Sequence, residues 1–175
     1  LRAIVAMDRD NGLEALAQVV TGRIPNVKVT ARLRGMAADQ LMVEDMERAG
    51  LALRQVIRTE SVRGINSQRL KPGEKVLMAR GASNRFHNFV TRYARTKDPE
   101  LDATLRMVLD REEHDRITLQ RSVEELGKIR SKLAAPRIRE LFLHPPGGAP
   151  PQIIQRNCEN AHAQIEETNL CGYQR

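Results

Sequence analysis

Four side chains near the C-terminus have the chemistry of zinc ligands: His144, Cys158, His162 and Cys171. Cys158 and His162 are four residues apart, which would place two ligands one turn apart on a helix. Cys171 and His144 do not form a second closely spaced pair, and His144 is separated from the others by a Pro-rich stretch. The spacing favours a buried cysteine and surface histidines over a metal site. A disulfide between Cys158 and Cys171, or to a partner, remains open in an oxidising compartment.

The acidic run 112–115, Glu-Glu-His-Asp, is a second group with ligand chemistry. Di-iron helices carry a glutamate three residues before the histidine, and Arg111 occupies that position here. The sequence also contains no nucleophile elbow, no P-loop and no dinucleotide-binding glycine motif. We therefore expect a non-enzymatic protein without a metal or another cofactor.

The strongest chemical signal is a block of bases between residues 61 and 97. The chain has 23 Arg, 6 Lys and a net charge of +7, and this block holds nine bases against the single acid Glu74. Elsewhere the charges nearly cancel. The nine bases are Arg63, Arg69, Lys71, Lys75, Arg80, Arg85, Arg92, Arg95 and Lys97.

Bases grouped in this way neutralise phosphates and release condensed counterions, so the block predicts contact with RNA or another polyanion. The planar donor fork of arginine suits phosphate oxygens. Two other partners remain open, an acidic protein surface and an anionic lipid. An arginine-rich composition also follows from a GC-rich genome, so the count of arginines carries less weight than their position.

Three aromatic residues lie inside the basic block at helical spacing, Phe86, Phe89 and Tyr93. Aromatic side chains on a basic surface can stack on the bases of single-stranded nucleic acid. A stripe at positions i, i+3 and i+7 is nevertheless more typical of a buried helix face. We expect these rings in the core and the neighbouring arginines outside it.

The remaining patterns predict a mainly α fold with two or three short strands in the first 80 residues. Residues 4–7 form a short apolar run. Residues 27–33 alternate apolar and polar side chains, the period of a half-buried strand. Residues 75–79 are a third strand candidate.

The longest predicted helix runs from about residue 99 to 135. Residues 98–100, Asp-Pro-Glu, form a favourable helix start, with a capping aspartate and a proline in the first turn. Its apolar positions fall into two patches around the charged stretch 110–116, where we expect any kink. Shorter helices are expected over 13–20 and about 36–58.

These elements divide the chain into five predicted parts. They are a small α/β or helical part (1–60), the basic segment with a short helix (61–97), the long helix (98–143), a Pro/Gly linker (144–151), and a C-terminal docking helix with its tail (152–175).

The composition favours a subunit of a larger assembly. Aromatic residues make up 3% of the chain and there is no Trp, so its core is thin and other protein subunits are expected to complete it. We expect no membrane span, because no apolar run is long enough. With only two cysteines, an intracellular, reducing compartment is the default. The first residue, Leu1, is typical of a fragment or of a protein that has lost a presequence, as mitochondrial proteins do.

Three functions follow in order of preference. The first is a non-enzymatic RNA-binding structural subunit of a ribonucleoprotein or an organellar ribosome. The second is a helical scaffold subunit of a complex without nucleic acid, such as a respiratory assembly or a virus particle. The third is a bacterial effector with a basic delivery region.

Overall fold

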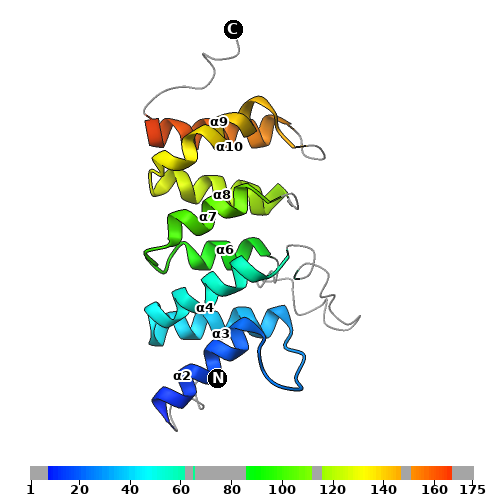
Figure 1. Ribbon diagram of the computed structural model, residues 1–175, viewed down its shortest axis with the longest axis vertical. Helices are drawn as coiled ribbons and strands as arrows, with labels where there is room; N and C mark the ends of the chain where they lie inside the picture. The colour runs from blue at the N-terminus through cyan, green and yellow to red at the C-terminus, as the bar shows by residue number, and fades with distance from the viewer. Residues whose placement is uncertain (1–7, 62–64, 66–85, 112–115, 147–150, 167–175) are drawn as a thin grey trace. The chain divides into compact units, whose positions relative to one another are not determined.

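Helices account for all of the regular secondary structure in the part of the chain that the computed structural model describes, residues 8–61, 65, 86–111, 116–146 and 151–166 (Figure 1). Within these ranges there are eight α-helices, one 3-10 helix and no strand. The prediction of a mainly α fold is confirmed. The chain divides into two compact units, Leu1–Leu101 (unit 1) and Asp102–Arg175 (unit 2).

Unit 1 contains the helices α2 (Arg9–Thr21), α3 (Ala31–Glu44), α4 (Met46–Thr59) and α6 (Phe86–Tyr93). The first three pack against one another, and α6 packs on α4 and α3. Phe86, Phe89 and Tyr93 are fully buried, so the prediction that they belong to the core is confirmed.

Aspartate caps begin two of these helices. Asp8 accepts a hydrogen bond from the backbone N–H of Asn11 at 3.2 Å, so the Asn-Gly pair that resembles a turn lies inside α2. Asp45 follows the last residue of α3, and its Oδ1 accepts the backbone N–H of Arg48 at 2.9 Å in α4. One capping residue therefore separates two helices where the apolar spacing had indicated a single one.

The strand predicted over residues 27–33 is wrong. Residues 24–30 form a loop, in which Asn26 has a φ of 59°, and α3 begins at Ala31. Thr30 caps α3, since its Oγ1 accepts the N–H of Leu33 at 3.3 Å. The alternation arose where a loop meets a helix N-terminus. The strand candidates 4–7 and 75–79 lie outside the described residues.

A buried arginine connects the four described helices of unit 1. Arg34 in α3 is 3% exposed, and its Nε donates to the carbonyl of Val20 in α2 at 2.7 Å. Its Nη1 donates to Glu60 Oε2 at 2.9 Å, at the end of α4, and its Nη2 pairs with the other carboxylate oxygen. The guanidinium also lies over the Phe89 ring of α6, 5.6 Å from its centroid. Each polar group is satisfied, as burial of a charge requires.

Unit 2 contains most of α7 (Leu101–Leu109), together with α8 (Arg116–Lys128), a 3-10 helix (Lys132–Ala134), α9 (Ala135–Leu143) and α10 (Pro151–Glu166). α10 packs along α8 and α9. Its buried side chains recur at helical spacing and are Ile154, Cys158, Ala161, His162 and Ile165.

The single long helix predicted over about 99–135 is also wrong. α7 ends at Leu109, and α8 ends at Lys128, where Arg130 adopts a φ of 53°. Ser131 then accepts the N–H of Ala134 at 3.2 Å and starts the 3-10 helix. The break after Leu109 coincides with the charged stretch where a kink was expected. The left-handed position that ends α8 is occupied by Arg130 rather than by glycine, so the sequence does not indicate this helix end.

Candidate anion-binding surface

Three of the nine predicted contact residues lie in the described part of the chain: Arg92, Arg95 and Lys97. The other six, Arg63, Arg69, Lys71, Lys75, Arg80 and Arg85, lie outside the described residues. Arg95 and Lys97 are exposed and follow α6 directly, and Lys97 has a φ of 55°. Neither forms an ion pair with a described acid, so both can meet an external anion.

Arg92 has a different role. Its Nε and Nη2 donate to the two carboxylate oxygens of Asp39 at 2.7 and 2.9 Å, joining α6 to α3. The guanidinium passes over Gly35, where an added Cβ would lie 3.4 Å from Nη2. Its side chain is only 18% exposed. Arg92 is therefore a structural link rather than an available cation.

Several other arginines of unit 1 are likewise neutralised by carboxylates from other elements. Arg54 pairs with Glu100 at 2.6 Å and with Asp98 at 3.4 Å. Arg58 Nη2 donates to the second Glu100 oxygen at 2.6 Å. This hydrogen bond, aided by the charge of Arg54, holds the pKa of Glu100 below its ordinary value.

Six described bases of unit 1 have no ion pair with a described acid. They are Arg9, Arg23, Lys28, Arg32, Arg95 and Lys97. Arg23, Lys28 and Arg32 lie in the loop after α2 and at the start of α3. They belong to a stretch, residues 15–38, that contains four bases and no acid. The near cancellation of charge outside residues 61–97 hides this stretch, because acids on both sides of it offset its bases. A sliding sum of charge would have revealed it.

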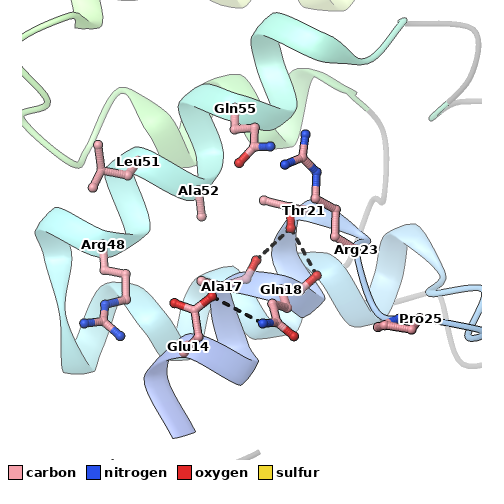
Figure 2. Close-up of a pocket in the computed structure, with 10 residues that line it drawn as sticks. All are labelled: Glu14, Ala17, Gln18, Thr21, Arg23, Pro25, Arg48, Leu51, Ala52 and Gln55. Carbon is pink, nitrogen blue, oxygen red and sulfur yellow. Dashed lines mark hydrogen bonds between the residues drawn. The ribbon is translucent and has the colours of Figure 1, made fainter. Parts of the chain in front are cut away.

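A groove of about 570 Å³ lies between α2 and α4, beside that loop (Figure 2). Its polar lining consists of Glu14, Gln18, Thr21, Arg23, Arg48 and Gln55. Figure 2 shows Arg23, Thr21 and Gln55 toward one end, and Glu14 and Arg48 toward the other. The small side chains of Ala17 and Ala52 line the space between the two helices.

The two ends of the groove differ in charge. Arg48 lies 3.5 Å from Asp45 Oδ2, and Glu14 lies at the same end. Arg23 contacts a neutral amide instead. With its oxygen turned toward the guanidinium, Gln55 accepts from Nη2, Nη1 and Nε at 2.5, 2.6 and 3.1 Å. The Arg23 end is therefore the positive one.

A second pocket in unit 1, of about 390 Å³, is lined by Gly50, Arg54, Lys97 and Asp98 among others. Its arginine is already paired with carboxylates, so the pocket offers an anion little beyond Lys97. The groove beside Arg23 is the more favourable of the two for an anionic ligand.

Cys158 is buried in α10, as expected, but His162 is buried too, so the expectation of a surface histidine is wrong for this residue. Burial raises the pKa of the Cys158 thiol to about 12, so it stays protonated at neutral pH and is a poor metal ligand or nucleophile. His144 is exposed, whereas Cys171 and the acidic run 112–115 lie outside the described residues. Among the described residues, no three His, Cys, Asp or Glu side chains gather as a metal site.

The described helices also include none that is both long and apolar enough to cross a membrane. In comparisons of sequence and structure, no protein-family model, curated protein or solved structure matches this chain.

Proposed function

We propose that this chain is a non-enzymatic structural subunit of a ribonucleoprotein, of the organellar ribosome type, and that unit 1 binds RNA. The observation that carries the proposal is the division of charge. Unit 1 has 18 bases and 11 acids, whereas unit 2 has 11 of each, so the whole net charge belongs to unit 1. Phosphate contacts supply most of the non-specific affinity for nucleic acid, and they require such an excess.

The contacts within unit 1 support the same proposal. Four of its acids, Asp39, Glu60, Asp98 and Glu100, pair with Arg34, Arg54, Arg58 and Arg92. The exposed Arg95 and Lys97 at the end of the basic segment remain available to phosphate. RNA is preferred to an acidic protein because the available cations are mostly arginine, whose donor fork matches phosphate oxygens.

The test is a salt titration of RNA binding with two matched variants. Fluorescence anisotropy of a labelled single-stranded RNA is followed with the full chain. One variant changes Arg63, Arg69, Arg80 and Arg85 to Gln. The control changes Arg116, Arg121, Lys132 and Arg156 of unit 2 to Gln and removes the same charge.

We expect the unit 1 variant to bind more weakly at low salt. Its log–log salt dependence should become shallower by about 0.7 for each single-strand phosphate that the variant no longer neutralises. The control should keep the wild-type slope. Affinity that does not change with salt, or equal weakening in the two variants, would exclude RNA binding through unit 1.

The second candidate is a helical scaffold subunit of a protein complex. It is favoured by the outer face of α3, where Leu33, Met36 and Val43 are 38%, 48% and 80% exposed. Apolar side chains grouped on one helix face are typical of protein contacts. Absence of RNA binding together with co-purification of stoichiometric protein subunits would favour this function.

A further inference from the structure

We propose that the groove between α2 and α4 binds a nucleoside monophosphate unit, with the phosphate at Arg23 and the nucleoside toward Glu14. A volume of about 570 Å³ lies within the range of small-ligand sites. The groove runs between two helices of one unit, so both walls belong to the same packed body.

The positive end fixes where the phosphate binds. The Arg23 guanidinium is oriented by Gln55 and forms no ion pair with a described acid. Arginine has five N–H donors, and Gln55 takes one from each of the three nitrogens of Arg23. One N–H on Nη1 and one on Nη2 remain for charge-assisted bonds to phosphate oxygens. Arg48, by contrast, already has Asp45 3.5 Å away.

The other end favours a group that donates hydrogen bonds. Glu14 is exposed, and its Oε1 accepts from Gln18 Nε2 at 3.3 Å, which leaves acceptor positions on both oxygens. Ribose hydroxyls and exocyclic amino groups are donors of this kind. A second phosphate beside Glu14 would be repelled, so a ligand with a single phosphate fits better than a polyphosphate.

The middle of the groove explains why a ring fits. Ala17 and Ala52 are small and leave space between α2 and α4, and Leu51 supplies an apolar edge. A flat base can occupy such a space, and the Gln18 amide offers both a donor and an acceptor to its edge. An acidic peptide has the charge but no ring of this shape.

Free nucleotides and single-stranded RNA both carry this unit. RNA as its source rests on the proposed function, whereas binding of a free nucleoside monophosphate does not. The experiment therefore measures both with the full chain, using calorimetry for AMP and UMP and anisotropy for a short single-stranded RNA.

Two variants change the groove, and each has a matched control. Arg23→Gln removes the phosphate contact, and Lys28→Gln removes an equal charge from the same loop outside the groove lining. Ala17→Leu fills the groove without altering charge. Ala15→Leu places the same side chain on α2 at a residue of similar exposure that does not line the groove.

We expect Arg23→Gln to weaken binding of the nucleotide about ten- to hundredfold, the effect typical of removing one charge-assisted hydrogen bond. Ala17→Leu should weaken it about tenfold or more, while the two controls bind as the wild type does. The inference is overturned if both groove variants bind like the wild type. An oligo-aspartate peptide that binds as tightly, with the same dependence on Arg23, would also overturn it.

Measuring free nucleotide and RNA side by side tests the groove and the RNA function independently. Nucleotide binding that depends on Arg23 and Ala17, without RNA binding, supports the groove and excludes the RNA function. RNA binding that is unchanged in both groove variants, together with no binding of free nucleotide, supports the RNA function and excludes the groove. RNA binding sensitive to both variants, with no binding of free nucleotide, identifies RNA as the source.

Discussion

The two units use their charged residues in different ways. Most ion pairs between described residues of unit 1 join separate elements, as in Arg34–Glu60, Arg54–Asp98 and Arg92–Asp39; Arg48–Asp45 is local. Those of unit 2 mostly link residues three or four positions apart in one helix, such as Arg121–Glu124 and Arg137–Glu140. Ion pairs therefore contribute to the packing of helices in unit 1. The net positive charge of the chain also lies in this unit.

In unit 2, α8 and α10 pack closely against each other. At Gly127 in α8, an added Cβ would lie 2.8 Å from the Cα and 2.9 Å from the Cβ of Ala161 in α10. Helices approach this closely only where one side chain is absent. The bases of unit 1 therefore fall into two groups: those whose ion pairs hold helices together, and those that have no ion pair with a described acid and can contact a partner.

The largest effect on stability is expected from Arg34. Arg34→Met removes the buried guanidinium together with its pair to Glu60 and its bond to Val20, which should lower the free energy of unfolding by about 3 kcal/mol. Glu60 is 27% exposed, so water recovers part of the stabilisation. Urea denaturation measures the change.

Arg32→Met is the matched control for Arg34→Met, since Arg32 is in the same helix and has no ion pair with a described acid. It should change stability by about 0.5 kcal/mol or less. Equal effects of the two substitutions would show that Arg34 is not the link between the helices.

The next largest effect is expected in unit 2. Gly127→Ala forces α8 and α10 apart and should cost about 2 kcal/mol. The added Cβ would lie 2.6 Å from the Gln164 side-chain oxygen, which can move, but also 2.8 Å from the Cα of Ala161, which cannot move without the helix. Gly35→Ala in α3 meets only the Arg92 guanidinium at 3.4 Å, so the gain in helix propensity should offset its strain. A stable Gly127→Ala protein with unchanged urea midpoint would contradict the close packing.

The sequence predicted those features that depend on local spacing. The i, i+3, i+7 pattern placed Phe86, Phe89 and Tyr93 in the core, and Asp98-Pro99-Glu100 indicated the start of α7. Asp98 does accept the backbone N–H of Glu100, at 2.7 Å, and α7 begins at Leu101.

The failures arose where tertiary contacts or single-residue conformations decide the structure. Arg130 ends α8 through a left-handed conformation that its residue type does not announce. Arg34 and Arg92 look like any other arginine in the sequence, yet contacts 26 and 53 residues away neutralise them. Residue type alone therefore could not distinguish the paired Arg92 from the exposed Arg95. It also could not place Arg23 beside the groove between α2 and α4, which forms only when the two helices pack.

A smaller change in stability should distinguish the paired Arg92 from the available Arg95 within the predicted site. Arg92→Gln breaks the pair with Asp39, which is 59% exposed, and should lower stability by about 1 kcal/mol or less. Arg95→Gln should leave stability unchanged and reduce RNA affinity. Urea denaturation and anisotropy are measured on both variants. A decrease of RNA affinity in Arg92→Gln equal to that in Arg95→Gln would remove the distinction.

The smallest expected effect on stability concerns an acid of unit 1, Glu100, which pairs with Arg54 and Arg58. The hydrogen bond from Arg58 and the charge of Arg54 hold its pKa below the ordinary value, so the folded state favours its ionised form. A folded-state pKa that is depressed stabilises the fold above the unfolded pKa, and this contribution disappears as the pH falls through the folded pKa. The difference in stability between the wild type and Glu100→Gln should therefore be present at neutral pH and shrink on acidification.

Carbon NMR of the Glu100 carboxyl should show its titration midpoint rising in Arg58→Gln and with added salt, because the side chain is exposed and screened. A midpoint that is the same in wild type and Arg58→Gln would show that Glu100 is not committed to Arg58, and the division of unit 1's charges would have to be redrawn there.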